Sequence, residues 1–529
     1  MPPSTMPSHA QNQEPSPSGA RPPRSRRWRR QREQRLEVDD VLVVNTSKIR
    51  TAIGGTVVGN FMEWFDFGVY GYMAILLAEL FFDTGDESLD LLLSLLAFAV
   101  SFLVRPLGGV VLGPLGDRIG RQKVLFFTMA MMAIATALIG VLPTYEQVGI
   151  WAAFALYALK LIQGFSTGGE YAGATTYVAE FSPDRKRGYY SSFLDVGSYL
   201  GFAAGAGSVA LTHLLAVQVG GPDAMAEWGW RIPFLLAIPL GAVAIYLRAR
   251  IPETPAFEDT DAAPAPVVHP DEADPSAIGM RKGVGGILRW HWRELLIAIA
   301  IVAATNTAGY ALTSYMPTYL GGQFGYNEMV SAAATIPALI ALAIGIPLFG
   351  KLSDRIGRRK VYLGAAFASV ALIAPAFAVM HLGSFWAIQG AMFIVALPVA
   401  MWIAGSAATL PALFPTASRY GAMGIAYNIS VSLFGGTTPL ISQYLVDLTG
   451  NSYMPAFWIM GFGVLGGIAV LCMRETAQRP LLGSFPTVET TAEAVEIVEG
   501  QEENPLLDVA EMPIPGTPAA PVIVGELDD

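Results

Sequence analysis

The feature that most constrains this chain is a series of long apolar stretches. A helix needs about 20 apolar residues to cross the ~30 Å hydrocarbon core of a bilayer. The 529-residue chain is 53% hydrophobic and 14% charged, whereas an ordinary soluble domain is about 25% charged. We therefore predict an all-α membrane protein with twelve transmembrane helices. The predicted spans are 52–81, 89–113, 123–143, 148–180, 188–217, 231–250, 295–320, 328–350, 360–380, 384–412, 420–447 and 453–473.

A charged, glycine-rich stretch occurs twice, as Gly113–Lys123 and as Gly350–Lys360. Both copies lie between two apolar spans and contain Asp-Arg-x-Gly-Arg. A second landmark, a short segment that begins with proline, ends at Arg187 after the fourth span and at Arg419 after the tenth. Landmarks that recur in the same order indicate a duplication. We predict two pseudo-symmetric six-helix halves with a substrate site between them, a known transporter construction.

Polar segments divide the rest of the chain. We expect a disordered Arg-rich tail at 1–47, a six-helix bundle at 48–250, a linker at 251–293, a second bundle at 294–475 and a disordered acidic tail at 476–529. Basic residues gather in alternate loops, and only Arg231 belongs to the opposite set. The positive-inside rule then places both termini in the cytoplasm of a multi-pass cell-membrane protein. The arginines of residues 24–35 form either a solvated tail or a contact with anionic lipid.

Ionisable residues inside apolar spans are costly and are therefore functional candidates. Glu63 and Asp66 lie three residues apart in the first span, and Lys160, Gln163 and Glu170 follow one face of the fourth. We predict that Lys160 is the counter-charge of the acidic pair. The residues predicted to carry proton coupling are Glu63, Asp66, Lys160 and Glu170. The alternatives are a buried ion pair that only orders the helices and, for Glu170, a packing hydrogen bond.

Several motifs resemble those of the metabolite:proton symporter family of the major facilitator superfamily, and within it the proline/glycine-betaine osmoprotectant transporters. Besides the paired Asp-Arg-x-Gly-Arg signatures, they are Gly59–Phe67, Arg105–Gly109, Leu161–Tyr171, Ser182–Arg187, Trp228–Phe234, Ala304–Asn306 and Arg474–Thr476. The resemblance covers about residues 50–482. It implies proton-driven transport by two halves that rock around a central site. Lys160 stands where that family usually has an arginine, and lysine lacks the planar fork that binds a carboxylate at two points.

The second half contributes neutral polar and aromatic residues rather than charges. A betaine's quaternary ammonium cannot donate a hydrogen bond, so it requires aromatic faces and nearby carboxylates. The predicted substrate-binding residues therefore come from both halves. They are Asp66, Tyr70, Gln163, Asn306, Tyr310, Trp402 and Asn428. Helix packing is the alternative for each aromatic residue taken alone.

The repeated motif also has a mechanical interpretation. Asp117 and Asp354 lie at span ends, where a carboxylate can cap the positive N-terminus of a neighbouring helix. The resemblance implies that these motifs act as latches, and a turn retained by the positive-inside rule is the alternative. The predicted gating residues are Arg105, Asp117, Arg118, Arg121, Asp195, Asp354, Arg355 and Arg358.

These observations predict a symporter that imports protons with proline, glycine betaine or a related zwitterion, and not an enzyme. One alternative is a proton symporter of a dicarboxylate or another organic acid, which the absence of arginine from the second-half spans disfavours. The other is a transporter-like membrane sensor. The expected partners are the zwitterionic or organic-acid substrate, protons and the bilayer, without nucleic acid. No cofactor or metal is expected, because five histidines and the single Cys472 supply no ligand cluster.

Overall fold

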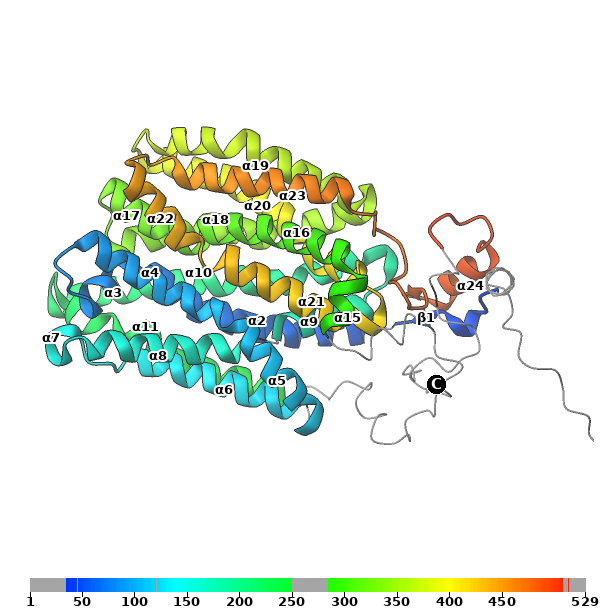
Figure 1. The fold of residues 1–529 in the computed structure, drawn as a ribbon, viewed down its shortest axis with the longest axis horizontal. Helices are drawn as coiled ribbons and strands as arrows, with labels where there is room; N and C mark the ends of the chain where they lie inside the picture. The colour runs from blue at the N-terminus through cyan, green and yellow to red at the C-terminus, as the bar shows by residue number, and fades with distance from the viewer. Residues whose placement is uncertain are drawn as a thin grey trace, which may run out of the picture.

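The computed structural model describes residues 35–44, 46–119, 121–168, 170–249, 284–507 and 512. Long helices lie side by side along one axis (Figure 1). We call the end of this bundle that carries β1 and α24 the tail end, and the opposite end the distal end. The arrangement confirms the predicted all-α class, because nearly every described residue of the bundle belongs to a helix.

The first half follows the predicted spans closely, although several of them are broken. The bend between the first two helices, at Met73, is 64°. The elements are α2 (Thr46–Tyr72), α3 (Ala74–Phe81), α4 (Glu87–Leu103), α5 (Arg105–Ile119), α6 (Arg121–Ile139), α7 (Tyr145–Val148), α8 (Trp151–Ser166), α9 (Glu170–Phe181), η2 (Asp184–Lys186), α10 (Arg187–Gly220), η3 (Met225–Gly229), α11 (Arg231–Leu235) and α12 (Ala237–Ala249).

The second half contains longer unbroken helices and two π-helical turns, η4 and η5, within its first and fifth spans. π-turns inside helices frequently mark functional sites. The elements are α15 (Val284–Trp290), α16 (Trp292–Tyr310), η4 (Ala311–Tyr315), α17 (Met316–Phe324), α18 (Glu328–Ile356), α19 (Arg358–Met380), α20 (Phe385–Ala412), α21 (Thr416–Ser430), η5 (Val431–Gly435), α22 (Thr438–Thr449) and α23 (Met454–Cys472).

Within the described residues, eight spans are long and apolar enough to cross a membrane, and α2 with α3 forms a ninth, bent span. The other three predicted spans correspond to α6, whose apolar part is short, and to the interrupted pairs α8–α9 and α21–α22. Breaks of this kind occur in transporters where the backbone lines a cavity instead of facing lipid.

Glycines let the helices that surround the centre approach closely. Gly197 of α10 faces the backbone carbonyl of Val57 in α2, where an added Cβ would lie only 2.5 Å from the oxygen. Small residues at such crossings bring two backbones together and allow dispersion contacts that a larger side chain would prevent. α10 also runs along α18 of the second half, so this one helix joins the first span to the opposite half.

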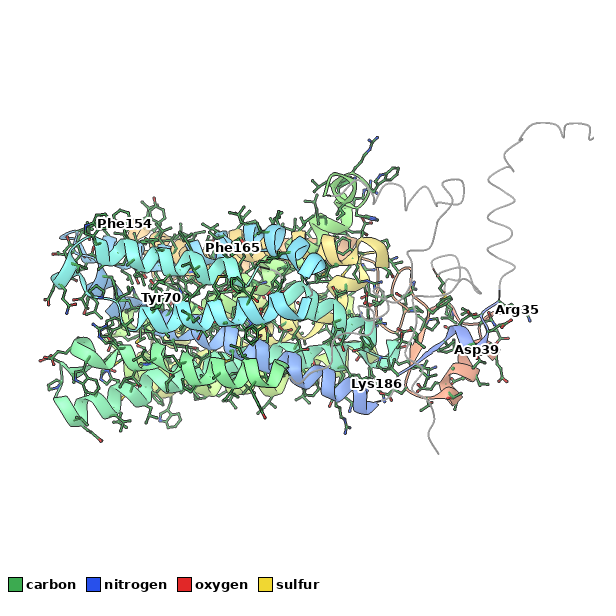
Figure 2. The ribbon with its side chains drawn as sticks, turned by 90° about the horizontal axis from the view of Figure 1, so that it is seen from below. Arg35, Asp39, Tyr70, Phe154, Phe165 and Lys186 are labelled. Carbon is green, nitrogen blue, oxygen red and sulfur yellow. The ribbon has the colours of Figure 1, made fainter. Side chains whose placement is uncertain are left out.

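The tail segments pair with each other. β1 (Leu42–Val43) and β2 (Thr487–Val488) form a parallel two-stranded sheet next to η1 (Val38–Asp40) and α24 (Thr491–Glu499). Figure 2 shows Arg35, Asp39 and Lys186 at this end of the molecule and Tyr70 within the bundle. The expected disorder over 476–529 is therefore wrong for 476–507, and that over 1–47 is wrong for 35–43. Composition could not reveal that two short apolar segments, far apart in the chain, bury Val41, Val488 and Ala494 together.

Some sequence predictions fall outside the described residues. These are the Arg-rich cluster before Arg35, linker residues 251–283 and residues 513–529. The backbone of Asp117, Arg118 and Arg121 lies in α5 and α6, but their side chains are also outside the description. The remainder of the predicted linker contains α15, a short helix that leads into α16.

Candidate substrate and proton site

The first buried charge cluster joins α2 to the start of α5. The Glu63 carboxylate and the Arg105 guanidinium form an ion pair, and both side chains are almost completely buried. The guanidinium lies over the rings of Trp64, Phe67 and Phe102, at 5.6, 5.2 and 4.8 Å from the ring centroids. An aromatic face stabilises a cation that has lost most of its water. In this cluster, the Glu63 carboxylate and three aromatic rings therefore compensate the charge of a buried arginine.

That pairing corrects the predicted counter-charge. Arg105, and not Lys160, neutralises Glu63. Helical spacing showed which face of α2 is polar, but the partner depended on the break at Val104 between α4 and α5, which places Arg105 at the start of a new helix. Arg105 thus lies in the centre of the bundle, in contact with one predicted proton-coupling residue, Glu63.

Asp66 belongs to a separate hydrogen-bond chain. The Thr136 hydroxyl lies 2.8 Å from Asp66 Oδ2, Gln163 Nε2 donates to Thr136 Oγ1 at 2.5 Å, and Lys160 Nζ donates to Gln163 Oε1 at 2.9 Å. Lys160 Nζ also lies 4.0 Å from the centroid of the Tyr70 ring. The chain thus joins Lys160 to Asp66 through two side chains, and the predicted part of both residues in proton coupling stays a prediction.

The Thr136 hydroxyl has a single proton and two possible acceptors. It lies 2.8 Å from Asp66 Oδ2 and 3.0 Å from the carbonyl oxygen of Met132. Asp66 Oδ1 is buried and forms no hydrogen bond with another described residue. A charged Asp66 attracts the hydroxyl proton, whereas a protonated Asp66 leaves the hydroxyl free to turn toward Met132. This arrangement suits a carboxylate that gains and loses a proton.

Glu170 begins α9 and accepts a hydrogen bond from Thr128 of α6 at 2.7 Å. This contact joins the third and fourth spans of the first half. It matches the packing alternative for Glu170 and leaves its predicted part in proton coupling as a prediction.

A cavity of about 50 Å³ lies between the two halves. At about 10–15 Å³ for each water, this volume corresponds to about four waters, or roughly 120 Å³ of liquid, which is the size of a small molecule. Six of its sixteen lining residues are aromatic, and Asp195 is its one acidic residue among those described. The lining residues are Trp64, Tyr171, Asp195, Ser198, Tyr199, Phe202, Val302, Thr305, Asn306, Gly309, Tyr310, Thr313, Ile403, Ser406, Leu410 and Tyr427.

Only part of the predicted substrate-binding set lines this cavity. Asn306 and Tyr310 do, on α16 of the second half. The Tyr70 hydroxyl instead donates to the carbonyl oxygen of Ser94 at 2.9 Å, away from the lining. The Asn428 amide donates to the carbonyl oxygen of Gly168 at 2.8 Å, so it links the halves. Asp66 and Gln163 belong to the hydrogen-bond chain described above.

Trp402 was expected at the substrate site, and this is wrong for the described cavity. Its indole N–H donates to Ser369 of α19 at 3.1 Å, and its ring packs at 5.4 Å from the Tyr362 ring. α20 is apolar on all sides, so its sequence has no polar face to indicate where the tryptophan points. Three further lining residues were not predicted from the sequence: Tyr171, Tyr199 and Tyr427. Each is a tyrosine next to a polar residue within an apolar span, and this pattern could have indicated them.

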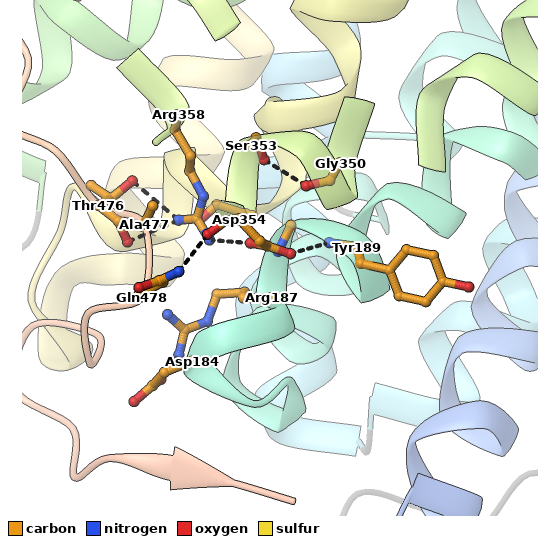
Figure 3. A network of polar contacts seen from close by, with 12 residues as sticks. Asp184, Arg187, Tyr189, Gly350, Ser353, Asp354, Arg358, Thr476, Ala477 and Gln478 are labelled. Atoms are coloured by element: carbon orange, nitrogen blue, oxygen red, sulfur yellow. Dashed lines mark hydrogen bonds and ion pairs between the residues drawn. The ribbon is translucent and has the colours of Figure 1, made fainter. Parts of the chain in front are cut away.

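Asp354 links the halves at the tail end. Its two carboxylate oxygens accept hydrogen bonds from the backbone N–H groups of Gly188 and Tyr189, each at 2.8 Å (Figure 3). The first turn of α10 has unpaired N–H groups and a partial positive charge. The expected carboxylate cap is therefore present, with the acid on one half and the capped helix on the other. Arg358 Nη2 lies 3.7 Å from Asp354, whereas Arg355 is exposed.

Comparison with known proteins identifies the family of the chain. A family model described as sugar (and other) transporter matches residues 53–483. The chain belongs to this family of the major facilitator superfamily. It is 59% identical to the ectoine/proline transporter ProP of Corynebacterium glutamicum, over 91% of this chain and 95% of that protein. It is 41% identical to the proline/betaine transporter of Escherichia coli K12, over 90% and 93% of the two chains.

A solved structure supports the same fold. The proton:xylose symporter XylE bound to 6-bromo-6-deoxy-D-glucose aligns with a TM-score of 0.65 at 18% identity, over 83% of this chain and 98% of that chain. At that identity the likeness concerns the fold alone. The family model and the curated relatives show that the chain is a multi-pass membrane transporter and not an enzyme, as predicted.

The duplication of this transporter is visible in the arginine geometry at the tail end. Arg187 Nε donates to the carbonyl oxygen of Ala179 at 2.9 Å, and Arg419 Nε donates to that of Pro411 at 3.1 Å. Each acceptor lies eight residues before its arginine. Arg419 also pairs with Glu180 at 2.5 Å and so connects α21 to α9 across the halves. The two landmarks read from the sequence therefore make equivalent local contacts.

Residues 475–484, which we call the tail strap, run across these arginines. Three buried guanidinium groups donate to strap carbonyl oxygens, two from the second half and one from the first. The pairs are Arg358 with Thr476 at 3.2 Å, Arg187 with Arg479 at 2.9 Å, and Arg419 with Leu482 at 2.9 Å. Because the strap contacts both halves, it stabilises the arrangement in which they meet at the tail end.

Proposed function

We propose that this chain imports small zwitterionic osmolytes, such as proline, glycine betaine or ectoine, together with protons by alternating access. The observation that carries the proposal is the cavity between the halves, whose described lining residues include six aromatic side chains and one carboxylate. Aromatic faces and a carboxylate bind a cationic nitrogen without requiring an N–H group. The relatives in Corynebacterium glutamicum and Escherichia coli are named for ectoine, proline and betaine transport.

The cavity adjoins the predicted proton-coupling residues through Trp64. This side chain lines the cavity on one side, and the Arg105 guanidinium of the Glu63–Arg105 pair lies over its ring. Protonation of Glu63 would remove the negative partner and leave the Arg105 charge over aromatic rings. Since an uncompensated buried charge is costly, we infer that loading a proton changes the packing of Trp64 and so couples to the cavity.

Asp66 is the second candidate for proton transfer. Its unpaired Oδ1 can accept a proton, and Thr136 can adjust to either state through its two acceptors. Intramembrane carboxylates in hydrogen-bond chains are typical of proton relays. Glu63 and Asp66 lie less than one helical turn apart on α2, so this helix is the element through which proton loading would act on the cavity.

Alternating access requires contacts that close each end in turn. At the tail end, Asp354 and the Glu180–Arg419 pair connect the halves. At the distal end, the Ser88 hydroxyl donates to Asp447 at 2.9 Å, from α4 to α22. The basic loops at the tail end fit a cytoplasmic location by the positive-inside rule, so we place the described tail segments in the cytoplasm.

A dicarboxylate fits the cavity less well. None of the described lining residues is a lysine or arginine, and Asp195 adds negative charge. Two carboxylates of the cargo would find no cationic partner in the wall, and buried like charges destabilise binding. The sensor alternative gains no support from the described tails, which form a short sheet, the helices η1 and α24 and the strap.

The test is uptake into proteoliposomes under an imposed proton gradient. We expect accumulation of labelled proline and glycine betaine, but not of succinate. Glu63→Gln and Asp66→Asn should abolish uphill accumulation and retain exchange of internal for external substrate, because exchange needs no net proton movement. Glu146→Gln, an exposed carboxylate variant, is the matched control. Succinate accumulation, or normal uphill uptake by both α2 variants, would overturn the proposal.

A further inference from the structure

One carboxylate oxygen of Asp195, in the cavity wall, has no partner among the described residues. The side chain is 6% exposed, and the Tyr171 hydroxyl donates to Oδ1 at 2.9 Å. Oδ2 is buried and forms no hydrogen bond with another described residue. No ion pair among the described residues includes Asp195. A buried carboxylate without a cationic partner is costly, so the group points to a cation that enters with the cargo.

The wall around this cavity is suited to a cation without N–H groups. The Tyr171 ring stacks on Tyr427, with centroids 4.2 Å apart, and the Trp64 ring lies 5.3 Å from that of Phe202. All four residues line the cavity. Aromatic faces attract quaternary ammonium groups electrostatically. Tyr171 therefore has two functions, since it contributes a ring to the wall and orients Asp195 through its hydroxyl.

The opposite half supplies a complementary group. The Tyr310 hydroxyl is buried and forms no hydrogen bond with another described residue. The ring is held edge-on to Phe102 and Trp64, at 5.2 and 5.7 Å. A tyrosine hydroxyl can donate its proton to a carboxylate. The described part of the wall thus has an unpaired carboxylate oxygen on α10 of the first half and an unpaired donor on α16 of the second.

We propose that Asp195 Oδ2 binds the cationic nitrogen of the zwitterion and that the Tyr310 hydroxyl donates to its carboxylate. This inference rests on the proposed function and specifies which residues recognise each charge. A zwitterion satisfies both groups and bridges the two halves. A simple carboxylate supplies only the acceptor for Tyr310, and a simple ammonium compound supplies only the cation for Asp195. Asp195, expected from the sequence to be a gating residue, is on this view a specificity residue.

The experiment is competition binding to purified full-length protein, without a proton gradient, against labelled glycine betaine. Two competitors each lack one charge. tert-Butylacetate, the anion of 3,3-dimethylbutanoic acid, has the shape and carboxylate of betaine with carbon in place of nitrogen. Choline has the trimethylammonium group without the carboxylate. The unmodified protein should prefer betaine to both by at least about 30-fold, roughly 2 kcal/mol at 1.4 kcal/mol for each tenfold change.

Each variant should remove one of these preferences. Asp195→Asn should weaken betaine binding about 30-fold and abolish its advantage over tert-butylacetate, because the amide carries no charge to attract the ammonium. Tyr310→Phe should reduce the advantage over choline and retain that over tert-butylacetate. Glu146→Gln, which removes an exposed carboxylate, should change neither preference.

Two results would overturn the inference. One is an Asp195→Asn protein that still prefers betaine to tert-butylacetate. The other is an Asp195→Asn protein with normal binding and exchange that loses only uphill uptake, since Asp195 would then be a proton site. If Asp195→Asn does not fold, Asp195→Glu decides, because it must retain the preference for betaine over tert-butylacetate. Failure of proton-driven uptake in the unmodified protein would instead refute the proposed function and leave the binding pattern to stand.

Discussion

The carboxylate of Asp354 in α18 accepts a 2.8 Å hydrogen bond from the backbone N–H of Gly188 at the start of α10. α18 belongs to the second half of the chain and α10 to the first half. The contact combines a hydrogen bond with the attraction between a carboxylate and a helix N-terminus. Opening the tail end must break it, so its strength contributes to the balance between states.

Asp354→Asn should shift this balance toward states open at the tail end. Loss of the charge at the helix N-terminus costs about 1–2 kcal/mol, roughly a 5- to 30-fold change in population. A cavity cysteine, Ser406→Cys in a Cys472→Ser background, should react faster with a membrane-impermeant thiol reagent added at the tail side. Asp447→Ala, which removes the acceptor of the distal hydrogen bond from Ser88, should slow that labelling. An unchanged rate in Asp354→Asn would contradict the latch.

Gly188→Ala should also favour states open at the tail end, in this case through a steric clash. A Cβ at Gly188 would lie 2.7 Å from Asp354 Oδ1 and 2.8 Å from the carbonyl oxygen of Gly350, so α10 and α18 would have to separate. Gly207→Ala is the matched control, because a Cβ there meets nothing within 4 Å on the same helix. We expect faster tail-side labelling for Gly188→Ala only. Equal behaviour of the two variants would show that the crossing tolerates a methyl group.

Two truncations should separate the tail strap from the segments beyond it. Deleting 485–529 removes β2 and α24 but retains the strap carbonyl groups, whereas deleting 475–529 leaves Arg187, Arg358 and Arg419 without those acceptors. Because each hydrogen bond to a charged group contributes about 1.5–3 kcal/mol, the longer deletion should lower the thermal unfolding temperature much more. Tryptophan fluorescence on heating would measure both, and equal temperatures would contradict this role of the strap.

The lowered pKa of Glu475 predicts that the stability of the fold depends on pH. Burial raises the pKa of this carboxyl, but hydrogen bonds from the backbone N–H groups of Ala477, Arg358, Arg359 and Thr476 outweigh it and leave the pKa below its ordinary value. A lowered native pKa stabilises the fold above the unfolded value of about 4.3 and loses this effect as pH falls through the native pKa. Glu475→Gln should therefore be less stable than the unmodified protein at neutral pH, and the difference should shrink below about pH 4. A constant difference from pH 7 to pH 3 in thermal unfolding would contradict this.

The spans and the duplication could be predicted because both are local properties. Hydrocarbon thickness sets the length of an apolar helix, and the repeated Asp-Arg-x-Gly-Arg motif marks the same turn in each half. Charge pairing was not local. Lys160 was the obvious partner for the α2 acids, yet Glu63 pairs with Arg105, because the α4–α5 break places that arginine in the centre. Periodicity identifies the polar face of one helix but not which neighbour covers it.

The amino-acid sequence by itself determined the membrane class, the spans, the family and the expectation of a small zwitterionic cargo. Apolar length and motif order are written along the chain, and the bilayer leaves few other folds for them. Only the tertiary structure decided that Asp195 and Tyr310 line the cavity, that Trp402 does not, and that the tail residues form a strap. Those facts depend on how helices distant in sequence rotate and cross, which is set by the packing of both halves together.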